Sequence, residues 1–236
     1  MNNKNLVMIV LGLIIIFTIT ICTVYYLTPM KTKQKYSGFS TQNLGNTSYG
    51  SVVKEGPYGN RESPIQIAII VGVHPLESDA HIAMLNAIKQ NSNSLKYGYT
   101  IYKVNVTQDP DDYQSGRMNG QLLANKFAVP DIINQKYKLA LDIHSNVGNW
   151  DESRFIFAPV AGSSSESIGR NLSNDLPWLS YYVPPNPTST VYVTEPLINA
   201  GIPALVYETF HNDSDNEKLN HANEFLMAVD GLKLER

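Results

Sequence analysis

Apolar runs alternate with helical repeats through most of this chain. Residues 65–73, IQIAIIVGV, form a β-branched apolar run typical of a buried strand. Further strands are predicted at residues 99–106, 138–145, 154–159 and 204–210. Helices are predicted at residues 78–90, 120–127, 166–174 and 196–201, and over the final apolar repeat at residues 219–229. Strands alternating with helices predict an α/β fold, a mostly parallel (mixed) sheet flanked by helices.

The N-terminal part of the chain has a different character. Residues 6–27 are uncharged and mostly apolar, long enough to cross a hydrocarbon core of about 30 Å. No small-residue cleavage site follows them, which favours an uncleaved transmembrane helix over a signal peptide. The next stretch is polar and lacks a sustained period. We therefore expect a membrane anchor at residues 1–28, a stalk at 29–58 and a folded domain at 59–236.

Charge and cysteine content limit the possible functions. The 236 residues carry a formal net charge of −3, and the basic residues are scattered, which argues against a nucleic-acid partner. The single cysteine, Cys22, lies in the predicted span. A disulfide within the folded domain and a cysteine nucleophile in it are both excluded.

The orientation of the predicted anchor rests on two opposed signals. One lysine precedes the span and three follow it, so the positive-inside rule would leave the domain in the cytoplasm. A short N-terminal tail favours export, and so do Asn-x-Ser/Thr acceptors at Asn46, Asn105, Asn171 and Asn212. We expect a single-pass membrane protein with an extracytoplasmic domain.

Polar residues stand where three of the predicted strands end. His74 closes the first strand, Asp142 and His144 the third, and Glu208 the fifth. In a parallel sheet these ends meet at one edge, where ligands bind. Pro75 suits the first position of a helix, so the side chain of Glu77 would turn back toward the same edge.

These residue types suit a zinc-dependent hydrolase. Imidazole and carboxylate are zinc ligands, and a catalytic site supplies three of them, here His74, Glu77 and His144. Asp142 would point to the same face as His144 and orient a ligating histidine, while Glu208 would act as a base beside a metal-bound water. Each residue alone has a plain structural reading as a helix-start acid, a loop cap or a satisfied strand-end histidine. Glu208 is the hardest to explain by a purely structural role, because burying an acid in a strand costs free energy unless the acid has a partner.

The motifs HPLE, LALDIHS and GIPALVYETF, in this order, resemble the zinc carboxypeptidase superfamily, including its succinylglutamate desuccinylase and aspartoacylase branch. The resemblance covers roughly residues 65–210. It implies a zinc-carboxypeptidase-like domain with one Zn²⁺ ion held by His74, Glu77 and His144. It also implies that Glu208 is the general base and then the general acid.

The chain departs from that family where substrate would be held. The Asn-Arg pair that clamps a substrate carboxylate is replaced by SGRMNG, so Arg117 and Asn119 become the candidate substrate-binding residues. Other candidate arginines are Arg154 and Arg170. The counterpart of the family's mobile tyrosine is expected at Tyr192, with Tyr181 and Tyr182 as competitors.

The sequence therefore predicts a membrane-anchored, zinc-dependent amide hydrolase, a metallocarboxypeptidase-like enzyme acting on peptides, including cell-wall peptides. One alternative is a deacylase of N-acyl amino acids, of the desuccinylase or aspartoacylase type. Another is a catalytically inactive, membrane-tethered domain that binds a peptide or glycan; an intact ligand set and Glu208 argue against it. A serine hydrolase is disfavoured because the chain lacks a Gly-x-Ser-x-Gly elbow.

Overall fold

The computed structural model describes residues 39–234, and the predicted membrane anchor at residues 6–27 lies outside them. Within the described part, no helix is both long and apolar enough to cross a membrane. The described residues belong to one compact unit of the chain.

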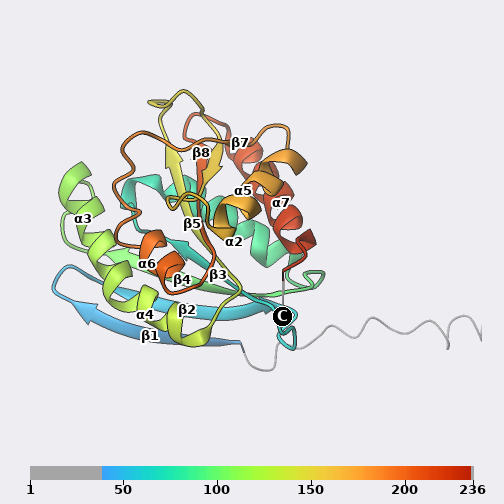
Figure 1. Cartoon of the computed structure of the whole chain (residues 1–236). Coiled ribbons are helices and arrows are strands. Elements are labelled where there is room, and N and C mark those ends of the chain that lie inside the picture. Colours follow the sequence, from blue (N-terminus) through green and yellow to red (C-terminus); the bar gives the residue numbers. More distant parts are fainter. Residues whose placement is uncertain (1–38, 235–236) are drawn as a thin grey trace, which may run out of the picture. The chain divides into compact units, whose positions relative to one another are not determined.

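A mixed eight-stranded sheet forms the centre of this unit, with the strand order β1-β2-β4-β3-β5-β8-β6-β7 (Figure 1). The central strands β4, β3, β5 and β8 are parallel, β1 and β2 add an antiparallel edge, and β6 is antiparallel to β8. The strand bounds are β1 Ser40–Thr47, β2 Gly50–Gly59, β3 Gln66–Val71, β4 Gly98–Val106, β5 Leu139–Asn146, β6 Phe155–Phe157, β7 Ser180–Tyr181 and β8 Ala204–Phe210. The predicted fold class, a largely parallel but mixed sheet, is confirmed.

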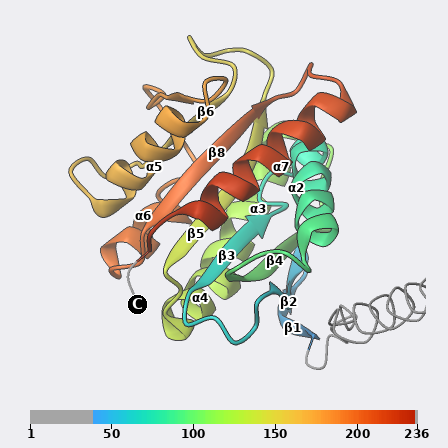
Figure 2. The ribbon, with the colours of Figure 1, turned by 90° about the vertical axis from the view of Figure 1, so that its right-hand side faces the viewer.

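Helices cover both faces of the sheet (Figure 2). One face packs against α2 (Ser78–Asn91), α5 (Ser164–Asp175) and α7 (Asp215–Gly231). The other packs against α3 (Tyr113–Leu123), the π-helical turn η2 (Ala124–Ala128), α4 (Val129–Gln135) and α6 (Thr194–Asn199). Successive side chains of a strand point to opposite faces, so β3 serves both cores: Ile67 and Ile69 enter the first, Ala68 and Ile70 the second. Burial on both faces explains why β3 is a continuous apolar run.

The folded domain begins earlier than the sequence predicts. Residues 40–58, assigned above to the stalk, form strands β1 and β2, and β2 pairs with β4 along nearly its whole length. The stalk prediction is wrong for these residues. An edge hairpin buries only one face, so its many Gly, Ser, Asn and Lys residues resemble a linker although Val52 is fully buried.

Helix α3 also begins before the predicted helix at residues 120–127. Asp112 caps its N-terminus by accepting hydrogen bonds from the backbone N–H groups of Gln114 (3.1 Å) and Ser115 (2.6 Å). Helix α7 starts with a capping box between Ser214 and Glu217. The earlier start of α3 matters for function, because it places another turn of helix beside the strand ends.

Candidate metal centre

The polar residues predicted to converge do so at the carboxyl ends of β3, β5 and β8. After β3, Gly72 adopts a positive φ of 87°, and a Cβ there would lie 2.1 Å from the Val104 carbonyl oxygen, so only glycine fits. The chain then enters the short 3-10 helix η1 (Pro75–Glu77), which follows His74 directly. On the neighbouring strands, His144 and Glu208 are paired in register.

His74, Glu77 and His144 form a compact cluster in which the glutamate lies between the two imidazoles. Glu77 Oε1 is 2.9 Å from His74 Nδ1, and its Oε2 is 2.8 Å from His144 Nδ1. One potential ligand atom from each residue lies within 4.8 Å of the others, and both histidines are buried. Two imidazoles and one carboxylate are a donor set that a catalytic zinc ion uses.

The pKa values of His74, His144 and Glu77 are shifted in different directions by their surroundings. Burial, reinforced by nearby His144, lowers the pKa of His74 to about 4, so this imidazole is neutral. Burial would also lower the pKa of His144, but Asp142 and Glu77 overcome it and raise that pKa well above its usual value. Burial opposes ionisation of Glu77, yet the two histidines keep its pKa well below the usual value.

Asp142 adds a further buried negative charge. Its Oδ2 lies 3.0 Å from His144 Nε2, but the contact lacks hydrogen-bond geometry, and both carboxylate oxygens and this nitrogen are without a hydrogen-bond partner. With Glu77 and Glu208, three carboxyl groups lie around the two imidazoles, and Arg117 brings one guanidinium to them. A divalent cation bound here would be attracted by these carboxyl groups and would take the place of the proton on His144, so the residues present fit such an ion.

Helix α3 reaches two of the three candidate ligands. Arg117 Nη1 donates to Glu77 Oε1 at 2.7 Å, and the Gln121 side-chain amide lies 3.1 Å from His74 Nε2. A Cβ on Gly120 would lie 1.9 Å from the Val73 carbonyl oxygen, so the glycine lets the helix approach this closely. The sequence analysis did not predict a role for Gln121 or Gly120. The i, i+4 spacing of Arg117 and Gln121, which places both on one helix face, could have pointed to Gln121.

Glu208 opens onto a cavity of about 490 Å³ that His74, Glu77 and Arg117 also line. Burial raises the pKa of Glu208 to about 8, with Glu77 adding to the effect and His144 opposing it. Asn146 Nδ2 lies 3.4 Å from Glu208 Oε2 and can donate to it. A carboxyl group that can exchange a proton near neutral pH thus faces the same space as the His-Glu-His cluster.

The cavity has an apolar wall and a mixed rim. Trp150, Phe157 and Val206 line the wall, and Phe157 and Val206 are paired on adjacent strands next to Glu208. Exposed apolar side chains at the rim are those of Leu76, Tyr113 and Val147.

His211 is a cavity-lining residue that the sequence analysis did not single out. Its Nδ1 lies 3.2 Å from Asp79 Oδ2, which also lies 2.8 Å from the Nζ of the buried Lys218. His211 is thus paired with Asp79 through Nδ1 while it lines the cavity.

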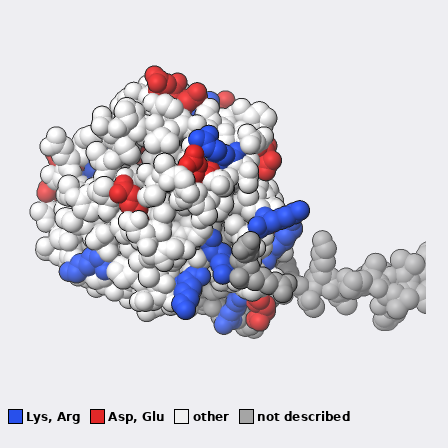
Figure 3. Space-filling model, in the orientation of Figure 1, with Lys and Arg blue, Asp and Glu red and all other residues white. Residues whose placement is uncertain are grey.

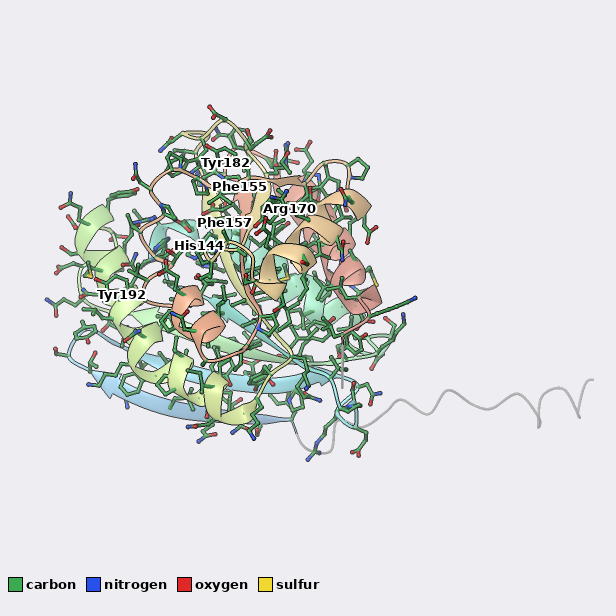
Figure 4. All side chains as sticks on the ribbon, in the orientation of Figure 1. His144, Phe155, Phe157, Arg170, Tyr182 and Tyr192 are labelled. Atoms are coloured by element: carbon green, nitrogen blue, oxygen red, sulfur yellow. The ribbon has the colours of Figure 1, made fainter. Side chains whose placement is uncertain are left out.

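Two of the predicted substrate-binding residues are not brought to the cavity. Asn119 Nδ2 donates to the Gln108 carbonyl oxygen at 3.0 Å, because that helix position faces the preceding loop. Tyr192 packs against the core beneath α3, α4 and α6, and Figure 4 shows it well away from His144. Neither residue lines the cavity, whereas Arg117, the third predicted binding residue, does. The predictions for Asn119 and Tyr192 are therefore not supported by their positions.

The competing candidates are occupied elsewhere. Arg154 Nε donates to Asp213 at 2.7 Å, and Arg170 pairs with Glu166 at 2.8 Å while its guanidinium lies over the Tyr181 ring. Tyr182 packs edge-on against Phe155. None of these arginines or tyrosines lines the cavity described above.

Figure 3 shows one face of the described part, most of which is uncharged. Basic side chains are spaced along its lower part, and acidic ones are separate from one another or gathered at the top. No extended basic surface of the kind that tracks a phosphate backbone is seen on this face.

Comparison with known proteins gives a fold. No protein-family model matches the sequence, and no curated protein matches it. A metallo-carboxypeptidase from Pseudomonas aeruginosa, solved in complex with (2-guanidinoethylmercapto)succinic acid, is similar with a TM-score of 0.55 at 12% identity, over 81% of this chain and 64% of that chain. A metallo-carboxypeptidase from Burkholderia cenocepacia is similar with a TM-score of 0.50 at 14% identity, over 83% of this chain and 65% of that chain.

An aspartoacylase family protein from Mesorhizobium loti is similar too, with a TM-score of 0.51 at 14% identity, over 84% of this chain and 68% of that chain. The chain thus spans about two thirds of the length of these solved structures. The fold expected from the motif resemblance, that of the metallo-carboxypeptidases and aspartoacylase-family proteins, is confirmed.

Proposed function

With a metallo-carboxypeptidase fold as the premise, we propose that this protein is a zinc-dependent amide hydrolase whose ligands are His74, Glu77 and His144. The observation that carries the proposal is the buried His-Glu-His cluster, which shares one cavity with the carboxylate of Glu208. A domain that only binds peptides or glycans would have no need of a proton-accepting carboxylate beside such a cluster.

Each polar group around the cluster has a role in this proposal. A zinc ion held there would supply Lewis acidity and lower the pKa of a bound water to about 7. Glu208 accepts the proton of the attacking water and returns it to the leaving amine. Arg117, already at the cluster through Glu77, donates to the carbonyl oxygen as negative charge develops on it. Asp142, 3.0 Å from His144 Nε2, favours a proton on that nitrogen and so leaves Nδ1 to face the cluster.

The cavity favours a peptide as the substrate. Its wall of Trp150, Phe157 and Val206 next to Glu208 suits an apolar side chain beside the scissile bond. The exposed rim residues Leu76 and Tyr113 offer contacts to a chain that extends beyond the cavity.

An N-acyl amino acid is the second candidate substrate. It is favoured by the likeness to an aspartoacylase family protein and by Arg117, which can bind a small carboxylate with two hydrogen bonds.

Membrane attachment through residues 6–27 is part of the proposal and rests on the apolar sequence alone. An extracytoplasmic domain is also part of it and rests on the short N-terminal tail and the Asn-x-Ser/Thr acceptors. A domain in that location would meet cell-wall peptides, which contain the amide bonds that such an enzyme would cleave.

Metal content tests the proposal first. Full-length protein purified in mild detergent is analysed for zinc as wild type and as His144→Ala. The control is His221→Gln, which changes a histidine that stacks on Trp178 away from the cluster. We expect about one zinc per chain in the wild type and the control, and its loss in His144→Ala. Wild-type protein that takes up no zinc after reconstitution would contradict the proposal.

The zinc-loaded protein is then assayed with peptides that carry apolar residues and with N-acyl amino acids. Release of a free amine from one class, absent in Glu208→Gln, identifies the substrate. If neither class of substrate is cleaved although zinc is bound, the proposal of a hydrolase is contradicted, and the protein is then a metal-binding domain without this activity.

A further inference from the structure

Gln121 belongs to the face of α3 that lies against the candidate metal cluster. Its side chain is almost completely buried, and the ring nitrogen that it meets, His74 Nε2, belongs to an equally buried residue. The other ring nitrogen, Nδ1, lies 2.9 Å from Glu77 Oε1. His74 is thus held from both sides, by a carboxylate at Nδ1 and by an amide at Nε2.

We propose that Gln121 is a positioning residue for His74, and that its amide serves both the metal-free and the zinc-bound state of that imidazole. The inference rests on the proposed function, because it takes His74 to be a zinc ligand. It assigns to this helix a role in metal binding that the motif HPLE does not carry.

The tautomer of the metal-free protein follows from the contacts. Glu77 is a carboxylate and can only accept, so Nδ1 carries the proton and donates to it. Nε2 is then unprotonated and accepts from the Gln121 amide N–H, which is 3.1 Å away. Both contacts are satisfied in this one tautomer.

Zinc requires the opposite tautomer. Nδ1 faces Glu77 and the cluster, so it is the nitrogen that binds the ion, and the ring proton must then reside on Nε2. An N–H at Nε2 needs an acceptor. A rotation of the Gln121 amide by half a turn exchanges its nitrogen and oxygen and supplies one, with little change in shape.

Few side chains can do both. A glutamate at this position would accept in the zinc-bound state but could not donate in the metal-free state, and a leucine would do neither. The close packing of α3, made possible by Gly120, keeps the amide within reach of the ring in both states.

Zinc affinity tests the role directly. Dissociation constants are measured by competition with a chromophoric chelator for the full-length wild type, Gln121→Leu and Gln121→Glu. The matched control is Gln114→Leu, an exposed glutamine on the same helix. We expect Gln121→Leu to bind zinc about ten- to a hundredfold more weakly, as for other residues that orient metal ligands. Gln121→Glu should bind at least as tightly as the wild type, and Gln114→Leu should be unchanged.

The wild-type protein gives a second readout, the position of the ring proton of His74. In two-bond ¹H–¹⁵N correlation spectra of protein labelled at histidine nitrogens, the His74 signals are assigned by their loss in His74→Ala. The proton should move from Nδ1 to Nε2 when zinc is added. If the proton stayed on Nδ1, the Gln121 amide would meet no N–H at Nε2 in the zinc-bound state, and the role assigned to it there would fail.

The possible outcomes separate the two proposals. Wild-type protein that binds no zinc overturns the proposed function. Zinc bound equally well by the wild type and Gln121→Leu overturns only the role of Gln121. A His74 proton that stays on Nδ1 while zinc is bound overturns that role and also the assignment of Nδ1 as the ligand atom.

Discussion

Glu208 shows how one residue gains a chemical role from its position. It is the last charged residue of β8, lies in register with His144 and opens onto the cavity, where burial raises its pKa. A nearby cation would lower that pKa, because it favours the ionised carboxyl. The residue is thus suited to take up and return a proton near neutral pH.

We expect Glu208→Gln to lower kcat by about a hundred- to ten-thousandfold with little loss of zinc, since glutamine keeps the shape but cannot accept a proton. Steady-state kinetics and metal analysis on the same preparation check this. In the wild type, kcat/KM should rise with pH as Glu208 loses its proton, and zinc should bring the midpoint below 8. If kcat/KM of Glu208→Gln rose with pH over the same range as in the wild type, Glu208 would not be the group that loses the proton.

His81 is a buried histidine of α2 outside the cluster, and it supports β5 just before His144. Its Nε2 lies 3.0 Å from the Ile143 carbonyl oxygen, which makes it a neutral donor. Burial, reinforced by the nearby His144, lowers its pKa from 6.5 to about 4. The unfolded chain therefore binds a proton that the folded chain does not between these two pH values.

This predicts an acid-dependent loss of stability that His81→Gln should reduce. Because the folded pKa is depressed, the full stability is present above pH 6.5 and is lost as the pH falls toward 4, by about 3 kcal/mol at most. Urea unfolding of metal-free wild type and variant across this range measures it. Parallel pH dependence of the two proteins would show that His81 is already charged in the folded state.

Among the elements, α3 links the fold to the candidate metal centre. The helix carries Arg117 and Gln121 on one face, and Gly120 brings that face against the backbone at Val73. Its position is set by backbone contact as well as by apolar side chains, so small changes in the helix should reach the cluster.

Gly120→Ala tests this link. Helix propensity alone would make alanine more stable than glycine by about 1 kcal/mol. The new Cβ would instead lie 1.9 Å from the Val73 carbonyl oxygen and push the helix away, so we expect a loss of about 1–3 kcal/mol and weaker zinc binding. Denaturant unfolding and zinc titration measure both effects.

Gly231→Ala is the control, because a Cβ there meets nothing within 4 Å. It should leave stability within about 0.5 kcal/mol of the wild type. A Gly120→Ala protein that behaves like this control would show that the close approach is not needed.

At the scale of the molecule, β1 and β2 complete the sheet. They cover the edge of β4 and bury Val52 in the core shared with α3 and α4. A chain that begins at residue 60 would leave β4 as a bare edge strand, and exposed edges favour aggregation.

We therefore expect protein that begins at residue 60 to aggregate, while protein that begins at residue 39 stays monomeric and folded. Gel filtration and circular dichroism of the two proteins check this. A monomeric, cooperatively unfolding protein from residue 60 would show that the hairpin is dispensable.

The sequence was sufficient for the central strands, for most of the helices around them and for the candidate ligands. Strands buried on both faces are continuous apolar runs, and a polar residue that ends such a run must lie at the strand end. For this reason His74, His144 and Glu208 could be placed at one edge of the sheet before their distances were known.

Other features depended on contacts between residues distant in the chain. The hairpin of β1 and β2 is polar enough to resemble a stalk, because it buries one face only. Asn119 is two residues from Arg117, and that spacing turns it to another side of α3, where it binds Gln108. Gln121 acquires its partner only when α3 packs against the turn after β3. Local periodicity determines which residues are buried, whereas the packing of helix against strand determines which polar groups meet.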